Sequence, residues 1–214
     1  TVTAFRHHEL VMSTTNPLWN RLIGMEDLLD TTGGAYAFSP TRDSMQELAW
    51  VFEPYRHARM SGVIDMKDAA TFTSIVNDVE LRILEYVAGK ARKIPLDTRY
   101  KLLNRSKTFW MIEEVGAYGK FGAIVDGAEA LVIVRRRPDG RYTYSLWRKS
   151  PWMPFQQSDL YAPLNEFEGE IAKNDPWGGG DMNGGSCRVN GSSKSPDALF
   201  SFIISQEERW LAIE

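Results

Sequence analysis

Residues 131–147 read LVIVRRRPDGRYTYSLW, and this stretch decides the fold class that we expect for the chain. Its four aliphatic residues at the start are typical of a buried strand, and its second half has the period-two alternation of another. Between them, Arg137-Pro138-Asp139-Gly140 is a strong turn signal, because glycine adopts a positive φ without steric cost. We therefore predict a β-hairpin formed by strands at 131–136 and 141–147.

On either side of this hairpin, the sequence predicts further strands at 109–115 and 121–126 and a helix at 158–172. Ser195-Pro196-Asp197 marks the start of a last helix, because serine is a favoured N-cap and proline a favoured first helical residue. Strands, helix, glycine-rich segment and helix together predict an α/β (α+β) mixed-sheet domain over residues 101–214.

The first 100 residues are expected to form a separate, mostly helical part. Short helices are predicted at 18–29 and from Ser39 onward, the second of them ending at Pro54. The longest is predicted between about Asp68 and Lys93 and would connect the two parts of the chain. Its apolar residues lie on one face of a 3.6-residue period: Phe72, Ile75, Val76, Val79, Ile83, Tyr86 and Val87.

Composition limits the classes of protein that this chain can represent. It has 214 residues, 43% hydrophobic and 25% charged, which is typical of a globular protein rather than a disordered one. The net charge of −3 provides no global attraction to nucleic acid or to an anionic membrane, so anion binding has to be local. No apolar run has the ~20 residues of a membrane span, and no secretory signal is recognised. Since Cys187 is the single cysteine, we expect a cytoplasmic protein with no membrane partner.

The strongest functional signal is residues 176–186, which read PWGGGDMNGGS. Five glycines among residues 178–185 favour a backbone that passes close to a ligand and aims several N–H groups at one point, an arrangement that suits phosphate. Arg148, Arg188 and Lys194 could add charge, and arginine can grip phosphate in a bidentate manner. The alternative is a surface loop that binds nothing.

Two other groups of residues could carry chemistry. His7-His8 offers imidazoles, although adjacent histidines point in different directions and so rarely bind one metal together, and both lie near a chain end. Asp30, before Thr31-Thr32-Gly33-Gly34, could present a carboxylate to a metal, or it could cap its own backbone in an Asx turn. Separately, Trp147, Trp152 and Trp177 could stack on nucleobases or anchor the core and loops.

A strand that ends in Ser145-x-x-Arg148-x-Ser150, then a helix, a glycine motif and a capped helix together resemble the DHH-associated C-terminal domain. This domain is the substrate-binding lobe of the DHH phosphoesterase superfamily. The resemblance implies that the lobe, spanning residues 101–214, grips a terminal phosphate or a nucleotide. The residues of the motif are Gly178, Gly179, Gly180, Gly184 and Gly185, with Asp181 where the family usually has histidine.

The same resemblance implies that residues 1–100 are a partial lobe holding two Mn²⁺ ions on Asp and His residues. His7-His8 matches the end of the Asp-His-His motif, with Arg6 in place of the aspartate. Asp30-Thr31-Thr32-Gly33 is similar to the metal-ligating Asp-Thr-Gly of the family. It follows from the resemblance that His7, His8 and Asp30 are catalytic, and that His8 and Asp30 are metal ligands.

The expected function is a phosphoesterase, or part of one, that hydrolyses phosphodiester bonds of nucleotides or short oligonucleotides through a metal-bridging water. An alternative is a catalytically degenerate relative that binds a nucleotide or a nucleic-acid end, or serves as a homodimer or a subunit of an assembly. Arg6 favours this alternative, because a cation at a ligand position would repel Mn²⁺. A third interpretation is an unrelated α/β domain whose glycine segment binds nothing.

Overall fold

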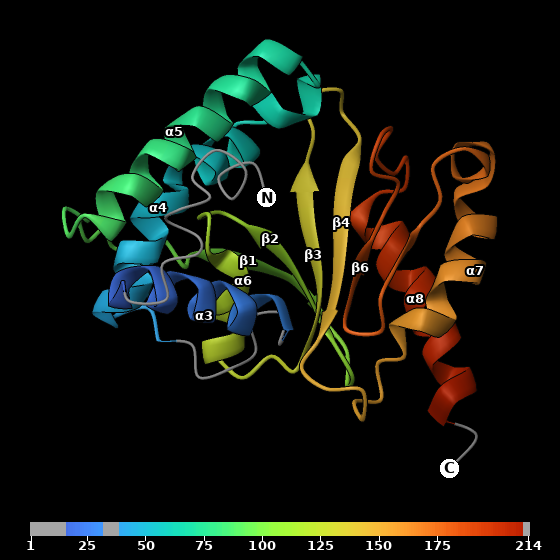
Figure 1. The fold of residues 1–214 in the computed structure, drawn as a ribbon. Helices are drawn as coiled ribbons and strands as arrows, with labels where there is room; N and C mark the ends of the chain where they lie inside the picture. The colour runs from blue at the N-terminus through green and yellow to red at the C-terminus, as the bar shows by residue number, and fades with distance from the viewer. Residues whose placement is uncertain (1–15, 32–38, 212–214) are drawn as a thin grey trace. The chain divides into compact units, whose positions relative to one another are not determined.

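The computed structural model describes residues 16–31 and 39–211, and the chain divides into two compact units, Thr1–Leu96 and Asp97–Glu214 (Figure 1). The described part of the first unit is helical, and the second is a six-stranded mixed sheet with interspersed helices. The expected fold class is therefore confirmed.

The helices of the first unit enclose a small core around Trp50 and Tyr86. Asn16 begins the first of them, since its Oδ1 accepts hydrogen bonds from the N–H groups of Leu18 and Trp19 at 3.0 and 3.1 Å. The elements are α3 (Pro17–Thr31), α4 (Asp43–Met60), the 3₁₀ helix η1 (Val63–Met66) and α5 (Ala69–Val87).

Pro54 does not end its helix, so this prediction was wrong. Proline lacks an N–H and leaves the carbonyl four residues earlier, that of Trp50, without its helical partner. Arg82 of α5 supplies the missing donor, its Nη1 lying 2.6 Å from the Trp50 oxygen and also 2.6 Å from the Glu53 carboxylate. Because a tertiary contact satisfies this carbonyl, α4 continues through Pro54 to Met60.

The long helix exists as predicted but ends at Val87 instead of near Lys93. At its start, the Asp68 carboxylate accepts the Thr71 N–H at 2.8 Å. At its end, Gly89 has a φ of +74°, and Lys90 donates its N–H to the Glu85 carbonyl at 2.8 Å. This is the glycine-terminated hydrogen-bond pattern that closes many helices.

In the second unit, the predicted hairpin forms the centre of the sheet. Strand β3 pairs with β4 in antiparallel register from Ala130↔Arg148 to Arg136↔Tyr142, and Gly140 has a φ of +82° in the turn, as predicted. The strand order is β1-β2-β3-β4-β6-β5, with β2 and β3 parallel and the other pairs antiparallel. The bounds are β1 (Tyr100–Arg105), β2 (Trp110–Glu114), β3 (Ala130–Arg136), β4 (Tyr142–Arg148), β5 (Gly178–Gly179) and β6 (Asn183–Gly185).

Residues 121–126, predicted as a strand, lie mostly in a helix, α6 (Gly119–Val125). Parallel strands need a crossover connection, and α6 provides it between β2 and β3. The helix fits closely against the chain before β1, because a Cβ on Gly119 would come 2.8 Å from the Arg99 carbonyl oxygen. Strand β1 was not predicted from the sequence.

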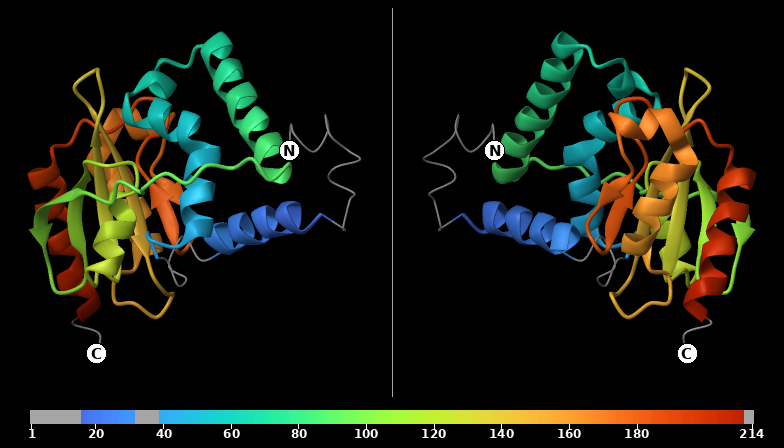
Figure 2. Two further views of the ribbon diagram at one scale, coloured as in Figure 1. Left: turned by 90° about the vertical axis from the view of Figure 1, so that its left-hand side faces the viewer. Right: turned by 90° about the vertical axis from the view of Figure 1, so that its right-hand side faces the viewer.

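Two helices cover one face of the sheet, α7 (Gln157–Glu168) and α8 (Pro196–Leu211), with the 3₁₀ helix η2 (Gly169–Lys173) after α7. They lie side by side in Figures 1 and 2, and the Phe167 and Phe202 rings stack between them at 4.2 Å. Both helices were predicted, and Ser195 caps α8 as expected, its Oγ accepting the Ala198 N–H at 3.3 Å. Tyr144 and Leu146 of β4 pack into the core beneath them.

Candidate functional site

The glycine-rich segment forms a β-hairpin at the edge of the sheet. Strand β5 pairs with β6 through Gly178↔Gly185 and Gly179↔Gly184, and β6 also pairs with β4. The Gly180 N–H donates to the Asn183 carbonyl at 2.8 Å and closes the turn, which we call the hairpin turn (residues 180–183). The segment therefore extends the sheet by two short strands.

The sequence pattern suggested that a bound ligand explains these glycines. In the structure, packing within the protein requires several of them. Tyr161 of α7 lies against the hairpin so closely that a Cβ on Gly184 would overlap its hydroxyl group. Burial raises the pKa of Tyr161, so the phenol keeps its proton and donates to the Gly180 carbonyl at 2.8 Å. In contrast, a Cβ on Gly178 would meet nothing within 4 Å, so no described neighbour requires glycine there.

Arg148 lies beneath the hairpin turn and is 2% exposed. Its Nε donates to the Asp181 carbonyl at 2.9 Å, and its Nη2 pairs with the carboxylate of the same residue. Its Nη1 donates to the Gln156 Oε1 at 2.7 Å and to the Phe155 carbonyl at 3.2 Å. The guanidinium thus joins the hairpin turn to the segment that follows β4, and these partners occupy most of its donors.

Ser145 and Arg148, predicted to act together, lie on opposite faces of the sheet. Alternation along β4 places Arg148 on the face covered by α7 and α8, and Ser145 and Trp147 on the other. Ser145 pairs with Gly185 in the sheet, and Trp147 with Asn183.

Two main-chain donors of the hairpin turn have no partner in the described part of the chain. The N–H groups of Asp181 and Met182 have no acceptor among residues 16–31 and 39–211, and Asp181 is exposed. The Met182 carbonyl accepts the Arg148 N–H at 3.2 Å, which keeps the turn beside the end of β4. Ser150 follows that end, and its Oγ accepts the Trp152 N–H at 3.3 Å. The structure therefore brings Ser150 and Asp181 to the same end of the sheet.

Arg188 lies at the other end of the sheet. It belongs to a turn closed by the Gly191 N–H, which donates to the Cys187 carbonyl at 2.9 Å, and Ser192 then pairs with Tyr142 at the start of β4. Since Tyr142 and Arg148 are the two ends of a seven-residue strand, about 20 Å separates them. The structure does not bring Arg188 and Arg148 together.

Two buried carboxylates that the sequence interpretation missed hold the chain on either side of the hairpin. Glu168 accepts hydrogen bonds from the Trp177 Nε1 at 3.1 Å and from the Ser193 N–H at 2.8 Å. Asp175 accepts the N–H groups of Val189 and Asn190 at 2.8 and 2.6 Å. Their sequence signal is weak, because acidic residues at or after the end of a helix are usually exposed to solvent.

Cys187 is buried beside these carboxylates. Burial, followed by the charges of Glu168 and Asp175, raises its pKa to about 11. Cys187 packs in the hydrophobic core of this unit, where the protonated thiol is favoured at neutral pH.

Among the proposed metal ligands, the structure describes Asp30 alone. His7 and His8 lie outside the described residues. Asp30 is exposed on the last turn of α3, one turn after Glu26, whose pKa is raised by burial and to a lesser extent by Asp30. In the described ranges 16–31 and 39–211, no group of three or more His, Cys, Asp or Glu residues could hold a metal ion.

Comparison with known proteins adds no relative: no family model, curated protein or solved structure matches this chain. Among the described helices, none combines the length and the apolar character needed to cross a membrane.

Proposed function

We propose that this chain is a DHH-like phosphoesterase, or part of one, whose Asp97–Glu214 unit binds a phosphoester group of a nucleotide or short oligonucleotide at the hairpin turn. One observation carries the proposal: the consecutive N–H groups of Asp181 and Met182 lack acceptors in the described part of the chain. Successive main-chain donors of this kind form anion-binding concavities.

The residues beneath the turn support this use. Arg148 neutralises the Asp181 carboxylate, which would otherwise repel an anion approaching the neighbouring N–H groups. Tyr161 and Gln157 both donate to the Gly180 carbonyl, at 2.8 and 3.0 Å, so the turn is held before a ligand arrives. A preorganised site loses less conformational entropy on binding. In this proposal Arg148 is a positioning residue and the main chain is the ligand-binding element.

The catalytic half of the proposal rests on His7, His8 and Asp30 and on the resemblance that relates them to a metal centre. Two Mn²⁺ ions, when bound, would supply an activated water for in-line attack on phosphorus. A degenerate relative that binds without hydrolysis is the second candidate, and it is favoured by Arg6 at the position of a metal-ligating aspartate.

Binding at the hairpin turn is tested by removing one main-chain donor. Met182→Pro deletes the N–H, whereas Met182→Ala keeps it and serves as the matched control. A hydrogen bond to a charged group contributes about 1.5–3 kcal/mol, so the proline variant should bind a short oligonucleotide about 10- to 150-fold more weakly than the alanine variant. Equal affinities in two folded variants would contradict the proposed site.

Turnover is measured in the same samples, as mononucleotide release with and without Mn²⁺. Metal-dependent release that His8→Ala abolishes is expected for a phosphoesterase. Binding without release would favour the degenerate relative. If the wild-type chain neither binds nor hydrolyses the oligonucleotide, both candidates are wrong and the glycine hairpin has a structural role alone.

A further inference from the structure

Trp152 exposes its indole to solvent to an extent that is unusual for a tryptophan. Its side chain is 89% exposed, whereas Trp147 and Trp177 are 0% and 2% exposed and pack inside the unit. Tryptophan normally buries much of its large apolar surface. Of the three tryptophans that the sequence suggested for stacking, Trp152 alone presents its ring.

Hydrogen bonds fix the backbone of the loop both before and after Trp152. The Trp152 N–H donates to the Ser150 Oγ at 3.3 Å, and the Met153 N–H donates to the Ser150 carbonyl at 3.2 Å. The Met153 carbonyl accepts the Gln156 Nε2 at 2.8 Å, and prolines at 151 and 154 restrict the backbone further. The ring is therefore presented from a backbone that is already ordered.

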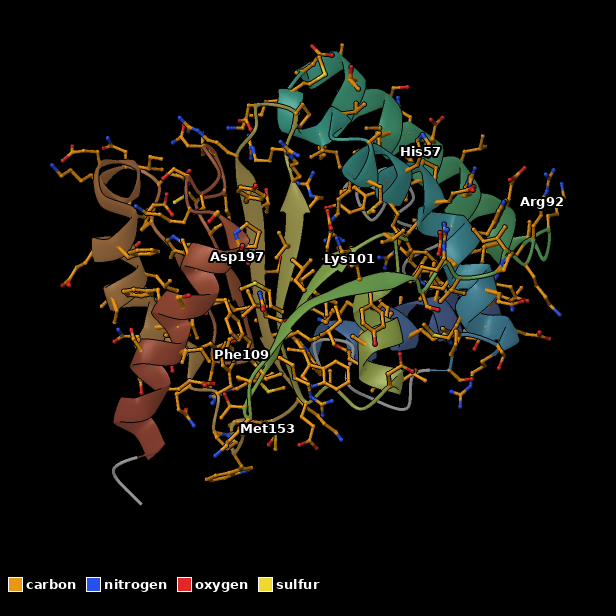
Figure 3. All side chains as sticks on the ribbon, turned by 180° about the vertical axis from the view of Figure 1, so that it is seen from behind. His57, Arg92, Lys101, Phe109, Met153 and Asp197 are labelled. Atoms are coloured by element: carbon orange, nitrogen blue, oxygen red, sulfur yellow. The ribbon has the colours of Figure 1, made fainter. Side chains whose placement is uncertain are left out.

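The same guanidinium that holds the hairpin turn also holds this loop. Arg148 donates to the Asp181 carbonyl in the turn at 2.9 Å and to the Phe155 carbonyl after the loop at 3.2 Å. The Phe155 ring contacts the Phe109 ring, with a centroid distance of 5.1 Å. Figure 3 shows Met153 at the end of the sheet that Phe109 occupies. The indole and the hairpin turn thus belong to one end of the sheet.

This end of the sheet also carries positive charge. Strand register places the β1–β2 connection here, with Lys107 exposed and without a hydrogen-bond or ion-pair partner among the described residues. Lys149 follows β4 and is half-exposed, 3.8 Å from Glu129. Glu129 and Asp181 offset Lys149 and Arg148 at this end, so Lys107 and the main-chain N–H groups of the hairpin turn are its remaining positive features. Together with an exposed indole, they suit a ligand that has both a flat ring and a negative charge, as a nucleotide does.

We infer that Trp152 stacks on the base of a single-stranded nucleic acid, next to the phosphate held at the hairpin turn. This inference rests on the proposed function. It specifies the ligand class, because a base within a duplex has both faces covered by neighbouring bases and offers none to an indole. Stacking tolerates any base sequence, so Trp152 contributes affinity without sequence preference.

The test compares two single-stranded oligomers of equal length at one low salt concentration: oligothymidylate, and an oligomer whose residues are all abasic. Each is titrated against the wild-type chain, Trp152→Ala and Trp152→Phe. Tyr55→Ala, which removes a 43% exposed aromatic ring from α4, is the control. Melting temperatures verify that the variants are folded.

We expect Trp152→Ala to weaken oligothymidylate binding about 5- to 150-fold, the range that one base–aromatic stack contributes. Trp152→Phe should restore most of the affinity, and all variants should bind the abasic oligomer within about twofold of wild type. If wild type binds both oligomers equally and Trp152→Ala changes neither affinity, the stacking role is overturned while phosphate binding stands. If wild type binds neither oligomer, the proposed function and this inference are both overturned.

Discussion

Arg148 donates from Nε to the main-chain carbonyl of Asp181 at 2.9 Å, and from Nη2 to the carboxylate of the same residue. Two contacts to one residue fix the hairpin turn relative to the end of β4. The arginine is 2% exposed, so its charge depends on these partners for compensation. The sequence suggested that Arg148 binds a ligand. In the structure, Arg148 instead holds the hairpin turn of the candidate site in place.

Removing the Asp181 carboxylate should destabilise the second unit. Asp181→Ala leaves part of a buried guanidinium without its anion, and we expect the free energy of unfolding to fall by about 1–3 kcal/mol, since the aspartate itself is half-exposed. Chemical denaturation measures the change. Glu166→Ala, at an exposed position of α7, is the control and should change stability by less than about 0.5 kcal/mol. Similar effects from both variants would contradict the role assigned to the pair.

The side chain of Tyr161 should prevent the substitution of Gly184 by any larger residue. Gly184→Ala places a methyl group against the Tyr161 ring and hydroxyl, and overpacking of this kind costs about 1–3 kcal/mol. Gly178→Ala, with nothing within 4 Å of the new Cβ, should cost far less. In a double-mutant cycle, Tyr161→Ala should relieve most of the Gly184→Ala penalty. Strictly additive effects would show that Tyr161 does not impose glycine at this position.

Arg82 and Pro54 should be energetically coupled in the first unit. Arg82→Met leaves the Trp50 carbonyl without a donor and should cost about 1–3 kcal/mol. With Pro54→Ala, the alanine N–H can donate to that carbonyl within the helix, so Arg82→Met should cost less in this background. Urea denaturation of the four proteins in the cycle gives the coupling energy. A value near zero would contradict the explanation for the continuous helix α4.

Deprotonation of Glu207 should lower the free energy of unfolding as the pH rises. It is 5% exposed on α8, and burial raises its pKa above the ordinary value of 4.5, while the hydrogen bond from Ser106 opposes the shift. The folded state therefore holds this proton more tightly than the unfolded state does. The associated stability is fully present below about pH 4.5 and is lost as the pH rises through the folded-state pKa.

Glu207→Gln removes this titration, so the stability difference between variant and wild type should grow in favour of the variant across that interval and then level off. Thermal or urea unfolding at a series of pH values follows the difference. A difference that stays constant from pH 4 to pH 8 would contradict the predicted linkage.

Local patterns in the sequence predicted the central hairpin and the start of α8 at Ser195. They predicted the apolar face of α5 in part: Val79, Ile83, Tyr86 and Val87 belong to the core, whereas Phe72 is 50% exposed. These features depend on turn chemistry, capping and hydrophobic periodicity, which act over a few neighbouring residues. Residues 121–126 were mistaken for a strand because a short apolar run has no clear period, and the parallel pairing of β2 with β3 decided in favour of a helix.

Some features of the candidate site were likewise predictable from the sequence, and others depend on tertiary structure. From the sequence alone, the five glycines of residues 178–185 predicted a main-chain segment that another group approaches closely, and at Gly184 that group is Tyr161. The remaining features depend on tertiary structure. Arg148 is buried, and Ser145 lies on the opposite face of the sheet. Arg188 lies at the far end of the sheet, and Trp152 is exposed. Burial and strand pairing depend on residues distant in the chain, and no local pattern contains that information.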